Sequence, residues 1–437
     1  MYQIKQNKNY TMQECYVLFF ALLPFLSVAQ IRTWMGDHAY QLWQFAGVGM
    51  MLALLAMEIH HVRFDLFVFG YTIYAVEIFV VSCVNRGFSP GTLVVTVGAI
   101  TVVMLIQARP DVVLRALTAL IALLVPCNFI SMLLSVHFSS DRFFLGGKNA
   151  LSMFLIPAAC LLLIFSLNRF GKFRVWEGSL AAMCFVCVFL GGSGTGIVTA
   201  GAALILLFVF LHFRPNIPLF LGVIALLYLL LTVFSEQLFS SSFWQSFVGM
   251  LDKDETLTSR TTIWEQVMKY FRASPSFGVG RGASISYVNA YGLRNTVYEA
   301  HNFVLEILLE GGIFAFAAYL LSFLSAVCRL RMNDKKQRVI FLAIAAILIN
   351  GLTESNNNHF FVIMLVAFAN AYADGAPLFA KYRKNDGREK KKQYSPQPSQ
   401  PLTQTTMCET SQFDCLDFSA NCQAIASSHP KGENPDG

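Results

Sequence analysis

Long apolar runs separated by short polar connections fill most of this chain. Most are close to the roughly 20 residues that a helix needs to cross a hydrocarbon core about 30 Å thick. The runs do not alternate apolar and polar positions with a period of two, as strands of a membrane β-barrel would. The pattern therefore predicts an all-α integral membrane protein with about twelve transmembrane helices. These are expected at about 14–31, 39–58, 64–84, 91–107, 116–136, 149–168, 178–193, 196–213, 217–235, 303–327, 339–354 and 358–375.

The distribution of Lys and Arg predicts the orientation, because loops on the cytoplasmic side of a membrane are enriched in these residues. With a cytoplasmic N-terminus, 22 of the 32 Lys and Arg residues fall in inward-facing segments. The short outer loops then carry only Arg32, Arg86, Arg142 and Lys148. We expect both termini to be cytoplasmic. The first apolar run continues to Arg32 without a small-residue cleavage site, so a retained helix is expected rather than a signal peptide.

Composition narrows the function class further. The chain is 55% hydrophobic and 13% charged, and its formal charge of +6 comes from the inward-facing loops. Because no basic patch with interleaved aromatic residues lies on a soluble domain, nucleic acid is not an expected partner. The pair Cys184-x-x-Cys187 lies in an apolar run without the strand-to-helix context of a redox motif. We expect no metal ion and no cofactor.

One long polar segment, 236–302, interrupts the apolar pattern between the ninth and tenth predicted helices. On the predicted topology it is extracytoplasmic, and polar loops on a rigid scaffold are where chemistry concentrates. The predicted organisation is a polytopic membrane domain, 1–375, that includes this catalytic loop with short interfacial helices. Residues 376–437 are rich in Lys, Pro, Gln and Ser and predict a disordered cytoplasmic tail.

A helix is predicted inside the long loop, starting at a Thr258 or Ser259 cap and ending near Ala273. Its apolar stripe consists of Ile263, Trp264, Val267, Met268 and Phe271. Such a helix should lie in the membrane interface with Trp264 at headgroup depth. Arg260 stands at its N-terminal end, where a guanidinium and backbone N–H groups favour a phosphate. The alternative is a surface arginine that anchors the helix to ordinary phospholipid.

The segment 277–282 contains three glycines in five residues, including Gly280 and Gly282. Such a turn can direct backbone N–H groups at a phosphate, and Arg281 lies within it. A plain turn after a helix is the alternative. Arg294 adds a further cation before the motif that contains His301.

His301 and Asn302 stand at the outer mouth of the tenth predicted helix, with Glu310 inside its first turns. An imidazole can accept a proton from a hydroxyl near neutral pH. A passive hydrogen-bonding role is the alternative. His359, in the polar run 354–359 at the outer mouth of the last helix pair, is a competing base. Carboxylates could also serve as the base (Asp252, Asp254, Glu255 and Glu299), and Glu77 is an intramembrane carboxylate of functional interest.

The order of these motifs resembles the O-antigen ligase / Wzy polymerase family. The motifs are Phe144–Asn149, Ser193–Gly196, Arg260-x-x-x-Trp264, the glycines of 278–282, and His301-Asn302 followed by Glu310-x-Gly312. The resemblance spans about 140–355. One position departs from it: where ligases of the family usually carry an arginine, this chain has Gly194.

The resemblance implies a metal-independent, inverting membrane glycosyltransferase of the bacterial cytoplasmic (inner) membrane. Its substrates would be polyprenyl-diphosphate-linked oligosaccharides, serving as donor and acceptor at the outer face. In the family, arginines hold the diphosphate and the loop histidine contacts or activates the acceptor hydroxyl, and Arg260 and His301 match those positions. We hypothesise that Arg281 or Arg294 replaces the arginine absent at Gly194. A flippase and a chain-length regulator are further expected partners, besides membrane lipid.

Polymerisation of repeat units into capsular, exo- or O-antigen polysaccharide is the expected activity. Ligation of a lipid-linked glycan to another carrier is the first alternative. A polysaccharide transporter or flippase is a second, but it predicts short outer loops and polar residues around a midplane cavity. A non-catalytic scaffold of an envelope complex is a third. The long outer loop and the few midplane charges favour the enzyme.

Overall fold

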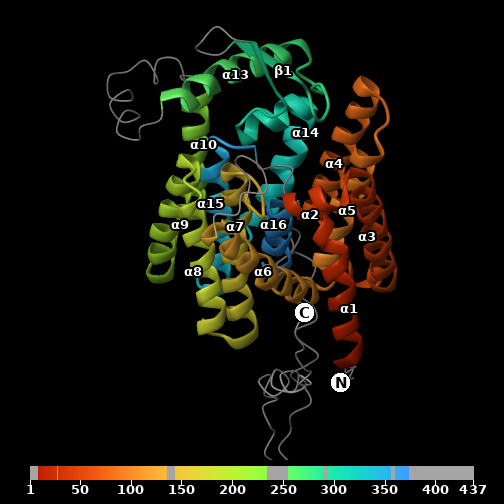
Figure 1. Cartoon of the computed structure of the whole chain (residues 1–437), viewed down its shortest axis with the longest axis vertical. Helices are drawn as coiled ribbons and strands as arrows, with labels where there is room; N and C mark the ends of the chain where they lie inside the picture. The colour runs from red at the N-terminus through yellow and green to blue at the C-terminus, as the bar shows by residue number, and fades with distance from the viewer. Residues whose placement is uncertain are drawn as a thin grey trace, which may run out of the picture. The chain divides into compact units, whose positions relative to one another are not determined.

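A computed structural model describes residues 8–26, 28–134, 143–233, 254–288, 294–355 and 360–373. Helices dominate the described residues (Figure 1). In chain order the long elements are α1 (Lys8–Leu22), α2 (Ala29–Met35), α3 (Asp37–Glu58), α4 (Leu66–Arg86), α5 (Pro90–Ala108), α6 (Pro110–Leu133), α7 (Lys148–Phe170), α8 (Val175–Leu190), α9 (Gly194–His212), α10 (Ile217–Val233), α13 (Asp254–Ala273), β1 (Ile285–Val288), β2 (Arg294–Val297), α14 (Phe303–Val327), α15 (Lys335–Gly351) and α16 (Phe360–Tyr372). Short 3-10 turns follow α1 at Leu23–Phe25 and α3 at Ile59–His61.

Each of the twelve apolar ranges contains a helix, and the tenth has the bounds expected from the sequence. In the described chain seven helices are long and apolar enough to cross a membrane, or eight if one bent pair forms a single span. The full count of twelve and the orientation stay predictions. The span expected at 14–31 is not a straight helix, because its two parts meet at 86°. The second of these parts is the short helix α2.

The centre of the bundle consists of α7, α15 and α16, whose side chains are buried around almost the whole helix. A helix that is apolar on all sides is stable only when other helices surround it. Among the described helices, α7 packs on α8, α9 and α15, while α4 packs along α14. Gly70 allows the close approach of α4, since a Cβ atom there would lie 3.1 Å from the Ala318 carbonyl oxygen.

The described part of the long loop forms a cap over the start of α14 (Figure 1). Strands β1 and β2 pair antiparallel, with Ile285 opposite Val297, so this part departs from the expected all-α fold. Trp264 of α13 is 2% exposed, and its indole N–H donates to the Ala300 carbonyl oxygen at 3.0 Å. Trp264 therefore packs against protein and not against lipid headgroups, and its depth in the membrane stays a prediction. The apolar stripe of α13 faces the hairpin and α14 because these surfaces together form a closed core.

The glycine-rich turn packs on a break in α14. Gly312 has φ 66° and ψ −160°, which opens the helix after its first turns. The N–H groups of Val279 and Gly280 donate to the carbonyl oxygens of Leu309 and Glu310, at 2.8 and 2.9 Å. The N–H of Arg281 donates to the Ser82 hydroxyl at 2.9 Å. These amides therefore hold the turn to α14 and α4, and they do not form the expected phosphate cradle.

We expect Gly280→Ala to lower the free energy of unfolding by about 3 kcal/mol and Gly282→Ala by only about 1 kcal/mol. Both residues have positive φ, 83° and 76°, so alanine strains the backbone at either position. At Gly280 the added Cβ would also lie 2.8 Å from Ser82 Cα, whereas at Gly282 the nearest atom is 3.7 Å away. Thermal unfolding of the detergent-solubilised variants measures the difference. Equal losses would contradict the close packing of Gly280 on α4.

Candidate active site

Arg260 and His301, which lie 41 residues apart in the chain, meet at one carboxylate, that of Glu354. The Arg260 Nη2 atom donates to Glu354 Oε1 at 2.6 Å, and His301 Nδ1 lies 3.4 Å from Glu354 Oε2. The Glu354 side chain is 1% exposed, the Arg260 side chain 10% and the His301 side chain 26%. The imidazole is thus the most accessible member of this triad, which we name the Arg260–Glu354–His301 triad.

The ends of three helices bring the triad together. Arg260 belongs to the first turns of α13, and Glu354 follows the end of α15, where its N–H donates to the Asn350 carbonyl oxygen. His301 has φ 50°, the one positive φ among the described residues other than glycine. Such a backbone costs about 1 kcal/mol or more, and it is typically retained at functional sites.

Asn302 fixes the backbone next to His301. Its side-chain oxygen accepts hydrogen bonds from the N–H groups of Val304 and Leu305, at 3.1 and 3.0 Å, and caps α14. Its side-chain NH₂ donates to the Leu352 carbonyl oxygen at 3.1 Å, which ties α14 to the end of α15. Asn302 is fully buried. In this structure it therefore positions the triad.

The start of α9 forms a polar wall beside the triad. Arg260 Nη1 donates to the Thr195 hydroxyl at 3.3 Å, so the guanidinium reaches the chain next to Gly194. The Ser193 hydroxyl caps α9 and donates to Asn149 Oδ1 of α7 at 2.8 Å. The two motifs Phe144–Asn149 and Ser193–Gly196 are therefore adjacent in space.

Glu354 carries its negative charge more readily than an ordinary carboxyl. Burial by itself raises the pKa of Glu354, but the hydrogen bond from His301 and the positive charge of Arg260 outweigh burial, so the pKa lies below its usual 4.5. A carboxylate that stays ionised at neutral pH can hold a guanidinium and orient an imidazole together.

This lowered pKa gives a pH-dependent contribution to stability. Glu354 stabilises the fold above pH 4.5, and the contribution is lost as the pH falls through the lowered pKa. We expect the melting-temperature difference between the wild-type protein and Glu354→Gln to be largest near neutral pH and to shrink below about pH 4.5. Melting curves in detergent from pH 7 to pH 3 measure it. A difference that is constant over this range would contradict the ion pair.

A second pair of charges lies further along α14. Arg281 Nε is 3.6 Å from Glu310 Oε1, and the Glu310 side chain is 1% exposed while that of Arg281 is 25% exposed. Arg86, at the end of α4, donates to the carbonyl oxygens of Val279 and Gly282. Two arginines therefore lie at the glycine-rich turn, and Arg281 is paired with the buried carboxylate of Glu310.

Other residues expected at the site are placed differently. Arg294 is exposed at the start of β2, and none of the contacts recorded for the described residues joins it to the triad. His359 and Asp252 lie outside the described residues. Glu77 of α4 lines an apolar groove with Phe277 and Phe314 and has one buried oxygen without a hydrogen bond. Within the described ranges no three His, Cys, Asp or Glu residues form a group that could hold a metal ion.

Glu354 is the site residue that the sequence analysis did not single out. One signal was present, because Glu354 begins the polar run 354–359 directly after an apolar helix. A carboxylate at such a position raises the free energy of the folded protein unless it is paired. Its partners, however, lie 94 and 53 residues earlier in the chain. No local spacing could join them.

Taken together, the triad offers a cation and a histidine around one buried carboxylate. A histidine held by a carboxylate on one ring nitrogen can accept a proton on the other, as in hydrolytic triads. A guanidinium carries five N–H donors in a planar fork, so it can hold a carboxylate and a phosphate oxygen together. This combination fits a reaction in which a hydroxyl attacks and an anionic group leaves.

The match to known proteins covers a third of the chain and most of this site. No curated protein matches the chain. Residues 178–320 match a family model described as O-antigen ligase. The matched segment contains Thr195, Arg260 and His301, while Glu354 lies beyond its end. The segment 178–320 of this membrane chain is therefore similar to the O-antigen ligase family.

Proposed function

We propose that the protein polymerises polyprenyl-diphosphate-linked oligosaccharide repeat units at the outer face of the bacterial cytoplasmic membrane. The observation that carries the proposal is the meeting of Arg260 and His301 at Glu354. The family match supports a glycosyl transfer that uses lipid-linked glycans, and the many apolar helices support a membrane location. No nucleotide sugar is available outside the cytoplasm, so a lipid diphosphate is the activated donor.

The three residues of the triad can account for each bond and proton that moves in the proposed reaction. An acceptor hydroxyl oxygen attacks the anomeric carbon, the bond from that carbon to the diphosphate oxygen breaks, and the diphosphate leaves with the electron pair. His301 takes the hydroxyl proton on Nε2, while Glu354 stabilises the imidazolium through Nδ1–H. Arg260 stabilises the charge that develops on the diphosphate. Attack opposite the leaving group inverts the anomeric carbon.

Arg281 is proposed as a second contact to the diphosphate, in place of the arginine absent at Gly194. Its side chain is partly exposed, and its partner Glu310 lies two turns along α14 from Asn302. Arg294 was the other candidate, and its exposed position on β2 gives it less support. If purified Arg281→Ala and Arg294→Ala both work at the wild-type rate, neither arginine has this role.

Ligation of one lipid-linked glycan to another carrier is the second candidate function, because the matched family model is described as O-antigen ligase. A cell-free assay with lipid-linked repeat units separates the two. Products that form a ladder of chain lengths support polymerisation, and single-step transfer to a different carrier supports ligation. Absence of both products with active-site-intact protein would contradict the enzyme and favour transport or a scaffold role.

We expect His301→Ala to lower the rate of product formation by roughly 10²-fold or more, while the protein remains assembled in the membrane. The imidazole is the base in the proposed reaction, and alanine leaves none in its place. Product formation from lipid-linked repeat units measures the effect, and His212→Ala is the matched control, since His212 is an exposed histidine at the end of α9. Wild-type turnover in His301→Ala would move the base role to His359 or a carboxylate.

A further inference from the structure

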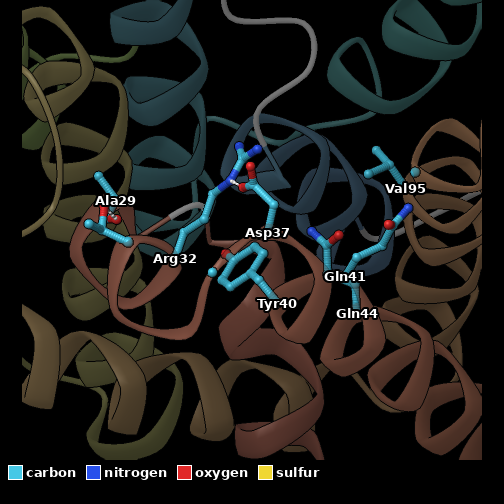
Figure 2. A pocket seen from close by; sticks show the side chains of 10 residues that line it. Ala29, Arg32, Asp37, Tyr40, Gln41, Gln44 and Val95 are labelled. Carbon is cyan, nitrogen blue, oxygen red and sulfur yellow. Dashed lines mark hydrogen bonds and ion pairs between the residues drawn. The ribbon is translucent and has the colours of Figure 1, made fainter.

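A large polar cavity lies away from the triad, between α2, the start of α3 and the start of α5 (Figure 2). Its volume is about 940 Å³, within the range of cavities that bind small molecules. Arg32, Asp37, Gln41 and Gln44 contribute polar side chains to its lining, and Gly91 of α5 forms part of the wall. Nothing in the reaction described above uses these residues.

The wall of this cavity is fixed by hydrogen bonds from its own residues. The Tyr40 hydroxyl donates to the Pro24 carbonyl oxygen at 2.7 Å, and Gln44 Nε2 donates to the same oxygen at 3.2 Å. Gly36, with φ 75°, makes the turn from α2 into α3. On its other side α2 is bonded to the motif before α7, through the N–H of Ala29 and the Leu145 carbonyl oxygen at 3.4 Å. The cavity is therefore preformed.

The lining chemistry selects a neutral, hydroxyl-rich ligand. Arg32 and Asp37 face each other, with Arg32 Nε donating to Asp37 Oδ1 at 2.7 Å, so the two charges cancel (Figure 2). An anion would meet the Asp37 carboxylate, and a hydrocarbon chain would cover amide groups that need hydrogen bonds. The side-chain amides of Gln41 and Gln44 contain both donors and an acceptor. Sugar hydroxyls likewise donate and accept, so a saccharide matches this lining.

A short chain segment and one shared lining residue relate the cavity to the glycine-rich turn. Arg86 bonds to the Val279 and Gly282 carbonyl oxygens, and Gly91, only five residues later in the chain, lines the cavity. Val95, one turn further along α5, lines both this cavity and a small second cavity that Arg281 also lines. A ligand in the large cavity therefore lies on the same side of the bundle as Arg281 and its partner Glu310.

We propose that this cavity binds the oligosaccharide portion of a lipid-linked substrate, with Gln41 as a hydrogen-bonding contact. The proposal rests on the proposed function, and it adds a saccharide subsite formed by α2, α3 and α5. These helices lie outside the segment that matches the family model. The subsite would give the protein a means to distinguish one neutral glycan from another at a distance from the reacting bond.

The test measures glycan binding without lipid, diphosphate or turnover. The probe is the oligosaccharide released by mild acid from the lipid-linked glycan that accumulates in cells lacking this protein. Its dissociation constant for the purified full-length protein in nanodiscs is measured by equilibrium dialysis. We expect Gln41→Met, which removes the amide and keeps the length, to weaken binding about fivefold. Gly91→Leu places a larger side chain of α5 in the cavity, so it should weaken oligosaccharide binding by more than Gln41→Met does.

A control variant separates an effect on the subsite from general damage to the protein. Gly49→Leu is the matched control on α3, because a Cβ atom there meets nothing within 4 Å and Gly49 does not line the cavity. It should bind the oligosaccharide like the wild type.

Each outcome decides between the proposals. Weaker binding in Gln41→Met and Gly91→Leu alone supports the subsite. If the wild-type protein does not bind the oligosaccharide, or all variants bind it equally, the subsite is wrong and the proposed function stands. If no lipid-linked glycan accumulates in the cells, the proposed function fails and the subsite fails with it.

Discussion

The Glu354→Gln substitution is expected to reduce glycosyl transfer by roughly 10²- to 10³-fold while the protein still assembles. Glutamine has the shape of glutamate but lacks the charge that holds Arg260 at 2.6 Å and faces His301 at 3.4 Å. Without that charge the imidazolium formed by proton transfer is not stabilised, and the ring loses the partner that fixes its orientation. Transfer from lipid-linked repeat units, measured as kcat and KM, should show the loss mainly in kcat.

A neighbouring buried carboxylate gives the control for this result. Glu306 is 2% exposed and accepts hydrogen bonds from the Ala300 N–H and the Ser355 hydroxyl, and it supports the same loops through these two bonds. Glu306→Gln should lower stability but leave kcat within a few-fold of the wild type. If Glu354→Gln also leaves kcat near the wild-type value, the role assigned to the triad is wrong.

Arg260→Gln should have an effect of about 10³-fold on transfer and should also lower the free energy of unfolding by about 3 kcal/mol. The guanidinium is the proposed contact to the leaving diphosphate, and its removal also leaves the Glu354 carboxylate, 1% exposed, without its closest cation. Arg260→Lys keeps the charge but not the planar fork, so we expect it to retain stability better than activity. Transfer assays and melting curves measure the two effects.

The double variant Arg260→Gln with Glu354→Gln separates catalysis from folding. Removing both charges takes away the unpaired carboxylate, so stability should recover towards the wild-type value. The rate of glycosyl transfer should stay as low as in the less active of the two single variants. The double variant lacks both the Arg260 cation and the Glu354 carboxylate that orients His301. Recovered transfer in the double variant would mean that the ion pair is only structural.

The positions of the helices were predictable because they depend on local composition. A run of about 20 apolar residues forms a helix in a membrane whatever surrounds it, since the backbone must satisfy its own hydrogen bonds there. The range 303–327 was therefore found to the residue. The bend between α1 and α2 was not predictable, because both sides of it are apolar.

The roles of residues in the long loop were harder to predict. The stripe that contains Trp264 has the same spacing whether it faces lipid or protein, so the sequence could not show that the hairpin and α14 cover it. The glycines of 278–282 fit a phosphate-binding turn as well as a packing turn. Their actual use depends on the break at Gly312, which provides carbonyl oxygens for the turn's N–H groups.

The sequence by itself indicated a helical membrane protein and the position of the long polar segment along the chain. It also indicated the two residue types, arginine and histidine, that carry the proposed chemistry. These follow from composition and order along the chain. Only the tertiary structure decided that Arg260 and His301 share Glu354, because that carboxylate comes from a helix end 94 and 53 residues further on. Contacts of that separation depend on how α13, α14 and α15 pack, which no local pattern specifies.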